Sequence, residues 1–269
     1  MNLITTVQVK SVLTRQSRFS SIPYDFTINP YRGCLFGCSY CYASKFVHGE
    51  DEKKAGWGQW VEIKQNALEA FFRESRKLQG KAVFFSSATD PYQPIERRLE
   101  LTRALLQALL FAFPRRVHMQ TRSPLVVRDI DLLLKFGDTL DVGISVPTDS
   151  ETVRRVFEPR APSIARRLAA AGELRDAGIR TTASVAPVLP CSPGRLARML
   201  APHFDRFWVD GINFYEKEAT LLRVYRDHGW EKYLGEGHVE AVRRELESVF
   251  SHTPTSINAV SRNSPQESE

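Results

Sequence analysis

Short apolar runs rich in β-branched and aromatic residues alternate with longer stretches of helical periodicity along most of the chain. The apolar runs predict strands over residues 25–29, 81–90, 115–123, 140–146, 179–189 and 205–214. The periodic stretches predict helices over residues 61–80, 95–113, 124–137, 150–178, 192–204 and 237–250. The helical region 150–178 is expected to break near Pro159 and Pro162. This alternation of about six β-α units predicts an α/β fold with a parallel sheet, helices packed outside it and right-handed crossovers.

The segments outside this alternation differ from it in composition. Residues 1–24 are polar and irregular, and we expect them to form an N-terminal extension before one domain over residues 25–252. The tail, residues 253–269, is polar and rich in Ser and Asn, so we expect it to be disordered. Residues 48–60 form a charged loop with two tryptophans, which suits either a lid over a site or an ordinary surface loop.

The overall charge changes this picture only slightly. The chain has 269 residues and a formal net charge of +6, which is compatible with an anionic partner such as nucleic acid, phosphate or a carboxylate. Much of the excess lies in helical stretches, so we favour solvated helix faces as its explanation. No stretch approaches the ~20 apolar residues that span a bilayer, and the start lacks the features of a secretory signal. We therefore expect a cytoplasmic protein without a membrane partner.

Three of the four cysteines lie within eight residues, in the stretch NPYRGCLFGCSYCYA. Disulfides are uncommon in the cytoplasm, so the spacing of Cys34, Cys38 and Cys41 indicates metal or redox chemistry. A redox dithiol of Cys38 and Cys41 leaves Cys34 unexplained. A zinc site needs a fourth ligand, which would have to come from His48 or the distant Cys191. We favour an iron–sulfur cluster held by three thiolates, with one iron open to a substrate or cofactor.

The residues around the cysteines suit such a cluster. Gly33 and Gly37 allow the backbone to wrap closely around it. Tyr40 and Tyr42 are placed to shield it or to stack on the ring of a ligand.

The cysteine spacing, with an aromatic residue before the third cysteine, resembles the radical S-adenosylmethionine (SAM) superfamily. The wider stretch NPYRGCLFGCSYCYA is similar to the spore photolyase-like branch of that superfamily. Three later stretches are similar to it as well, namely TDPYQP (89–94), TRSPLVVRD (121–129) and FEPRAPSIARRL (157–168). The resemblance runs from about residue 29 to residue 214.

This resemblance implies a fold and a chemistry. The fold would be a partial, TIM-like (β/α)6 barrel, in which Cys34, Cys38 and Cys41 hold a [4Fe–4S] cluster. The open iron would bind SAM, and one electron from a low-potential donor such as flavodoxin or ferredoxin would cleave it to methionine and a 5′-deoxyadenosyl radical. That radical would take a hydrogen atom from the substrate.

The resemblance also indicates residues near SAM. Tyr40 is expected beside the adenine, with shielding of the cluster as the alternative. Ser87, Thr89 and Asp90 follow the second strand and are expected to meet the methionine amine. The alternative is that Asp90 merely begins a turn.

Four further residues are expected to bind SAM by the same resemblance. Arg122 would lie near SAM, Ser145 would bond the ribose, and Glu158 and Arg167 would lie near the ribose or the carboxylate. The alternatives are a surface salt bridge for Arg122, a local hydrogen bond for Ser145 and an ordinary charged helix position for Arg167.

Other residues at strand ends are weaker candidates. Cys191 follows the fifth strand, and we expect it either to return a hydrogen atom to a product radical or to pack as a small apolar side chain. Asp210 and Asn213 lie in the sixth predicted strand and are candidates for substrate contact. His118 lies within a predicted strand, and we expect it to be a packed or half-exposed side chain.

Three hypotheses for function remain at this point. Spore photolyase proper has a hydrogen-donating cysteine near the place where this chain has Ser87, and a serine O–H bond is too strong for that role. We therefore favour a radical SAM enzyme that acts on a small molecule over one that repairs or modifies nucleic acid. A cluster-bearing binding or electron-transfer protein without radical chemistry is the third hypothesis.

Overall fold

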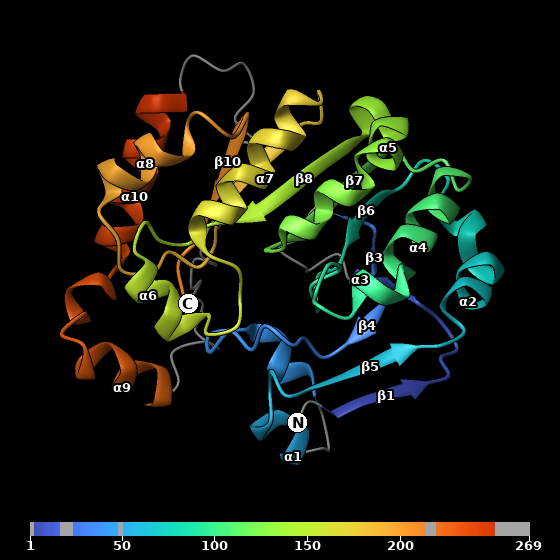
Figure 1. Cartoon of the computed structure of the whole chain (residues 1–269), viewed down its shortest axis with the longest axis horizontal. Coiled ribbons are helices and arrows are strands. Elements are labelled where there is room, and N and C mark those ends of the chain that lie inside the picture. The colour runs from blue at the N-terminus through green and yellow to red at the C-terminus, as the bar shows by residue number, and fades with distance from the viewer. Residues whose placement is uncertain (1–2, 17–23, 48–50, 213–218, 251–269) are drawn as a thin grey trace, which may run out of the picture.

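The computed structural model describes residues 3–16, 24–47, 51–212 and 219–250 (Figure 1). Its main sheet has seven strands in the order β10-β9-β8-β7-β6-β3-β2. The strands in chain order are β2 (Leu13–Arg15), β3 (Phe26–Ile28), β6 (Ala82–Phe85), β7 (Arg116–Thr121), β8 (Leu140–Ser145), β9 (Thr181–Val185) and β10 (Arg206–Val209). The strands from β3 to β10 are parallel, and β2 pairs antiparallel with β3. Six parallel strands in chain order confirm the predicted α/β fold.

Helices surround the outer side of this curved sheet, most visibly α2, α4, α5, α7, α8 and α10 (Figure 1). The α-helices are α1 (Asp51–Ala55), α2 (Ala67–Glu74), α3 (Glu96–Leu99), α4 (Leu101–Leu110), α5 (Ile130–Leu133), α6 (Glu151–Phe157), α7 (Ile164–Asp176), α8 (Pro193–Leu200), α9 (Ala219–Asp227) and α10 (Glu236–Phe250). Short 3-10 helices are η1 (Tyr42–Phe46), η2 (Ser75–Leu78), η3 (Pro124–Asp129), η4 (Leu134–Thr139) and η6 (Glu231–Tyr233). No helix in the described ranges is long and apolar enough to cross a bilayer.

The main hydrophobic core lies between the sheet and these helices. Val117 and Met119 of β7 belong to it, together with Leu105 of α4, Leu174 of α7 and Leu246 of α10. Each of these leucines is fully buried, which stabilises the fold by roughly 2 kcal/mol per side chain. Since successive side chains of a strand point to opposite faces, the residues between those of the core line the inner, concave face of the sheet.

A second sheet, of three strands, was not predicted from the sequence. β1 (Leu3–Val7) pairs in parallel with β5 (Trp60–Lys64), and β4 (Tyr31–Arg32) pairs with β5 on its other side. The predicted helix over residues 61–80 is wrong at its start, because β5 occupies that part and α2 begins at Ala67. The expectation of an irregular start is also wrong, since β1 and β2 form there. Pairing with distant strands overrides the local pattern.

The remaining helix predictions agree with the structure in position. The predicted break near Pro159 and Pro162 separates α6 from α7. The helix predicted over residues 95–113 is divided at Glu100, which has a left-handed backbone with φ of 50°. The predicted tail, residues 253–269, lies outside the described residues. The division of the chain into extension, domain and tail stays a prediction.

Candidate functional site

The cysteine loop begins at the carboxyl end of β3 and ends in η1. Cys34 and Cys38 are buried, Cys41 is partly exposed, and none of them forms a disulfide. Cys34 and Cys38 belong to one apolar group with Phe36 and Tyr40, and the side chain of Cys41 packs against this group. The structure therefore brings the three predicted ligands into one place.

The surroundings of Cys34 suit a thiolate that binds metal. Burial raises the pKa of the Cys34 thiol to about 12, although the backbone N–H groups of Phe36 and Asp90 favour its charged form. Burial also raises the pKa of Cys38 well above its usual value. Metal ligation releases the thiol proton, and the two backbone donors remain to stabilise the resulting thiolate.

Two glycines shape the loop and allow a close contact with the segment around Gly58. Gly33 and Gly37 have φ of 82° and 60°, a conformation that side chains disfavour. A Cβ atom on Gly37 would lie 3.0 Å from the Cα of Gly58, and one on Gly33 would lie 2.7 Å from the ring of Trp60. The segment around Gly58 therefore packs directly on the backbone of the cysteine loop.

Among the described residues, no group of three or more His, Cys, Asp or Glu side chains is arranged to hold a single metal ion. An iron–sulfur cluster makes a different demand on the chain. Its three thiolates bind three different irons, so they lie farther apart than the ligands of one ion. The three cysteine side chains, none of which is in a disulfide, and the backbone donors that face Cys34 fit a cluster of this kind.

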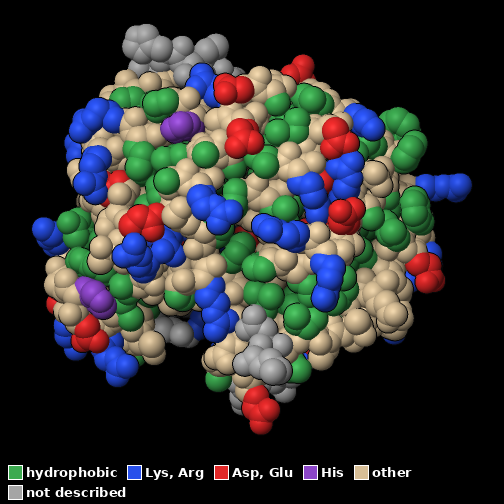
Figure 2. Space-filling view, viewed as in Figure 1, with side chains coloured by type: hydrophobic (Ala, Val, Ile, Leu, Met, Phe, Trp, Pro, Cys, Tyr) green, Lys and Arg blue, Asp and Glu red, His purple; other side chains and the backbone are tan. Residues whose placement is uncertain are grey.

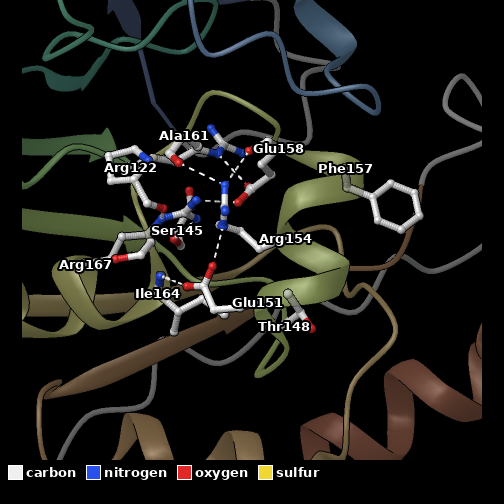
Figure 3. A network of polar contacts seen from close by, with 12 residues as sticks. Arg122, Ser145, Thr148, Glu151, Arg154, Phe157, Glu158, Ala161, Ile164 and Arg167 are labelled. Carbon is white, nitrogen blue, oxygen red and sulfur yellow. Dashed lines mark hydrogen bonds and ion pairs between the residues drawn. The ribbon is translucent and has the colours of Figure 1, made fainter.

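A buried network of charged side chains lies beside the cysteine loop (Figure 3). Glu158, at the end of α6, accepts hydrogen bonds from Arg122 Nε at 2.9 Å, from Arg167 Nη2 at 2.5 Å and from the hydroxyl of Tyr40. Arg122 Nη2 also donates to the Tyr40 oxygen at 3.0 Å. Arg167 Nη1 donates to the carbonyl of Ser145 at 2.9 Å. The structure thus brings five of the predicted SAM residues together.

The charges of this network do not cancel. Two guanidinium groups, of Arg122 and Arg167, face the one carboxylate of Glu158, so these three side chains together carry one net positive charge, and Arg122 favours the charged form of Cys38. Burial raises the pKa of Glu158, but the charges of Arg167 and Arg122 outweigh it and bring the value down to about 2. Arg167 is fully buried, which rules out the alternative of a solvated helix position.

Arg154 of α6 holds the corner between α6 and α7 that carries this network (Figure 3). Its Nη1 donates to the carbonyls of Glu158 and Ala161 at 3.0 Å each, and its Nε donates to Glu151 at 2.8 Å. The sequence analysis missed this residue, because an arginine on an amphipathic helix usually points to solvent. The backbone N–H of Ser39 donates to the carbonyl of Phe157 at 2.9 Å, which joins the same corner to the cysteine loop.

The loop after β6 lies against the cysteine loop as well. Thr89 donates to the carbonyl of Gly33 at 2.6 Å. Asp90 is buried and accepts hydrogen bonds from the hydroxyl of Thr121 and from the backbone N–H groups of Arg122 and Tyr92, at 2.7 to 2.9 Å. A carboxylate has about four acceptor positions, so one remains for a ligand. The contact with Tyr92 is also the turn that the alternative interpretation expects.

Ser86 is a candidate that the sequence analysis missed. It directly follows β6 with φ of 68°, is 4% exposed, and its hydroxyl has no hydrogen-bond partner among the described residues. A non-glycine residue in this conformation costs about 1–3 kcal/mol, and such strain is typical of functional positions. No sequence signal marks it, because Ser87 beside it looks the same. Ser87 accepts a weak hydrogen bond from Asn29 at 3.4 Å.

Cys191 lies in the loop after β9 but packs away from the other cysteines. It belongs to the main core rather than to the group around Cys38, and its sulfur lies 3.5 Å from Nε2 of His238 on α10. This position favours packing as its role. The side chain of Asp210 accepts a hydrogen bond from the backbone of Gly211 at 2.9 Å. Asn213 and His48 lie outside the described residues.

The inner face of the sheet is polar between β7 and β9. His118 is packed as predicted, with Nδ1 2.7 Å from Asp141, whose other oxygen accepts from Thr182 at 2.7 Å. Gln120 is partly exposed and donates to the hydroxyl of Ser145 at 2.7 Å. Gln120 is therefore the local hydrogen-bond partner that the alternative interpretation expects for Ser145, although the O–H of Ser145 can still donate. This face offers hydrogen-bonding groups to a polar molecule.

The sequence was compared with known families and proteins. A family model described as the radical SAM superfamily matches residues 28–193. An uncharacterised protein of Methanocaldococcus jannaschii is 33% identical over 223 residues, which cover 80% of this chain and 77% of the relative. An uncharacterised protein of the Acidianus two-tailed virus is 31% identical over 165 residues, which cover 59% of this chain and 54% of the viral protein.

Solved structures of spore photoproduct lyase have a similar fold. A doubly substituted variant with bound AdoMet, which is SAM, and dinucleoside spore photoproduct aligns with a TM-score of 0.63 at 18% identity. The lyase complexed with dinucleoside spore photoproduct aligns with a TM-score of 0.62 at 18% identity. Both alignments cover 92% of this chain and 79% of the other. At this identity the likeness shows a shared fold.

Proposed function

This chain belongs to the radical SAM superfamily, and we propose that it abstracts a hydrogen atom from a small polar molecule held on the inner face of its sheet. It is an enzyme whose cofactors are a [4Fe–4S] cluster and SAM, and it requires a reductant. When bound, the cluster would supply an electron and SAM would supply a sulfonium group, and cleavage of that sulfonium would give methionine and a 5′-deoxyadenosyl radical.

In this proposal Cys34, Cys38 and Cys41 hold the cluster. Their convergence in one buried group and the backbone N–H groups facing Cys34 support this role. The net positive charge shared by Arg122, Glu158 and Arg167 offsets the negative charge of three thiolates and of the SAM carboxylate.

The strand ends around the cysteines bind the rest of SAM. Tyr40 is held by Glu158 and Arg122, which fixes its ring for contact with the adenine. The unpartnered hydroxyl of Ser86, together with Ser87, Thr89 and the free acceptor position of Asp90, binds the methionine amine. The O–H of Ser145 donates to the ribose.

The polar inner face is the observation that carries the assignment of substrate class. Gln120 and Ser184 line it and are groups that bind a hydrogen-bonding molecule, whereas His118 and Asp141 beside them are already hydrogen-bonded to each other, to Gln120 and to Thr182. At the end of β6 stand Ser86 and Ser87, neither of which donates a hydrogen atom readily. A reaction that needs no thiol donor at that place fits this arrangement.

Anaerobic turnover tests the proposal. The reconstituted enzyme is mixed with reductant, SAM and polar small molecules that carry deuterium on carbon. Deuterium in the 5′-deoxyadenosine identifies the substrate that loses a hydrogen atom. If small molecules transfer no deuterium whereas a deuterated oligonucleotide does, the proposed substrate class is wrong.

A nucleic-acid substrate is the second candidate. The fold neighbours bound to dinucleoside spore photoproduct and the net charge of +6 favour it. On the face shown in Figure 2, Lys and Arg side chains are spread widely, and several lie directly beside Asp or Glu. Phosphate binding weakens steeply with salt. A gel shift at low salt that disappears as salt rises supports this candidate, and no shift at low salt contradicts it.

A further inference from the structure

The indole N–H of Trp57 is a buried donor without a protein acceptor. Its Nε1 atom is inaccessible to solvent and has no hydrogen-bond partner among the residues that the structure describes. An indole nitrogen is a donor only, and burying it unpaired costs about 1–3 kcal/mol. Most buried polar groups of native proteins have a partner, so this N–H indicates an acceptor that the protein chain does not supply.

The position of Trp57 limits what this acceptor is. Its side chain packs against the apolar group that contains Cys34, Cys38 and Phe36. The next residue, Gly58, touches Gly37, which lies between those two cysteines in the loop. The buried donor therefore lies at the cysteine loop.

The segment that carries Trp57 is held firmly in place. The carbonyl of Gly58 accepts a hydrogen bond from Arg160, in the connection between α6 and α7. The backbone N–H of Trp57 donates to the carbonyl of Lys54 at 3.3 Å. The rings of Trp57 and Trp60 meet edge to face, with centroids 6.0 Å apart. The orientation of the Trp57 indole is thus fixed by its neighbours on several sides.

Trp60 shows what an indole in this segment does when an acceptor is present. Its Nε1 donates to the carbonyl of Lys53 at 2.6 Å. The two tryptophans lie three residues apart, yet the N–H of Trp60 binds a backbone carbonyl, whereas the N–H of Trp57 has no partner within the described ranges and its ring packs against the apolar group that contains Cys34 and Cys38. When the cluster is bound, its sulfur atoms add hydrogen-bond acceptors to this part of the molecule.

We propose that the indole N–H of Trp57 donates a hydrogen bond to a sulfur atom of the iron–sulfur cluster. This proposal rests on ligation of that cluster by Cys34, Cys38 and Cys41. Hydrogen bonds to cluster sulfurs are one of the factors that set its reduction potential. Because reduction adds negative charge, the bond stabilises the reduced state more than the oxidised state. Trp57 is therefore a positioning and tuning residue that raises the potential of the cluster.

The first test compares Trp57→Phe with Trp60→Phe in the reconstituted holoenzyme. Both variants keep an aromatic ring and lose an indole N–H. At a fixed potential, we expect the ratio of reduced to oxidised cluster in Trp57→Phe to fall about fivefold, as for one lost hydrogen bond. Trp60→Phe is expected to keep the wild-type ratio. The ratio is measured by EPR during an anaerobic redox titration, and iron content is measured beside it.

The outcomes separate this proposal from the proposed function. A wild-type protein that binds no cluster contradicts the assignment of the cysteines. Full iron content in Trp57→Phe with an unchanged ratio overturns the role of Trp57 and leaves the cysteine assignment intact.

A second measurement detects the hydrogen bond in the wild-type chain itself, and the two variants then assign it to a residue. The wild-type chain is labelled with ¹⁵N in its tryptophan indoles, and the reduced cluster is examined by pulsed EPR. We expect a ¹⁵N coupling from an indole hydrogen-bonded to the cluster, and Trp57→Phe should lack it while Trp60→Phe retains it. If the wild-type spectrum shows no indole coupling, the proposed hydrogen bond does not exist.

Discussion

The carboxylate of Glu158 lies 2.5 Å from the guanidinium of Arg167, and both side chains are completely excluded from solvent. The same carboxylate binds Arg122 and Tyr40, so it joins α6, α7, the end of β7 and the cysteine loop. A buried charge in this position is stable only with its partners, because the interior does not screen or solvate it. In the proposed function, stability and cofactor binding therefore depend on the same group.

Glu158→Gln keeps the size of the side chain and removes its charge. We expect a loss of about 3 kcal/mol in the free energy of unfolding, because the fully buried Arg167 and the partly exposed Arg122 lose their counter-charge. Asp131→Asn is the control, since it removes a carboxylate from the exposed ion pair with Arg103. Such exposed pairs contribute little. Urea denaturation measures both variants, and equal losses in the two would contradict the account.

The acid dependence of stability follows from the same carboxylate. The pKa of Glu158 is about 2 in the folded chain, against an ordinary value of 4.5. Its contribution is complete above pH 4.5 and is lost as the pH falls towards 2, amounting to about 3 kcal/mol. Below pH 4.5 the wild-type chain should therefore lose stability more steeply than Glu158→Gln, by up to about 1.4 kcal/mol per pH unit.

This comparison is made by denaturant titration of the metal-free proteins between pH 5 and pH 2, because acid removes iron from the cluster. Parallel curves for the wild type and Glu158→Gln would show that the folded pKa of Glu158 is not depressed.

Gly37→Ala tests the packing of the cysteine loop. Gly37 has φ of 60°, and an added Cβ would lie 3.0 Å from the backbone of Gly58. Gly80→Ala is the matched control, because Gly80 has φ of 67° but nothing within 4 Å of the added atom. Both variants carry the cost of a left-handed alanine, about 1 kcal/mol. Iron content after reconstitution should fall in Gly37→Ala alone, and equal iron in both would argue against the close contact.

Substitution of each cysteine distinguishes the ligands of the cluster from a cysteine that only packs in the core. Alanine at Cys34, Cys38 or Cys41 should remove the iron and abolish cleavage of SAM, since three thiolates are needed to hold the cluster. Cys191→Ala should retain iron and SAM cleavage, because Cys191 packs in the main core. If it changes the product instead, Cys191 has the donor role considered from the sequence. Full activity of Cys38→Ala would rule out the proposed ligation.

Much of the fold was predictable because it depends on local patterns. Each of the six parallel strands lies inside a predicted apolar run, and the prolines at 159 and 162 mark a real break between helices. β1 and β5 were missed because they are defined by pairing with each other across more than fifty residues. The start of the chain carries no periodic signal that reveals such a partner.

The candidate site was predictable to the extent that it depends on sequence motifs. The cysteine spacing identified the family, and Tyr40, Arg122, Ser145, Glu158 and Arg167 do lie together. The sequence did not reveal which hydrogen bonds and ion pairs these side chains form with one another. The strained backbone of Ser86 and the unpaired N–H of Trp57 have no sequence signature, because they arise from how distant loops meet.

The central claim is that three thiolates hold a cluster whose remaining iron binds SAM. The most direct test is to reduce the protein anaerobically with SAM, and to measure its iron and the 5′-deoxyadenosine formed. The account predicts about four irons per chain, with 5′-deoxyadenosine and methionine formed in equal amounts. A colourless protein that holds zinc or no metal and forms no 5′-deoxyadenosine would contradict it.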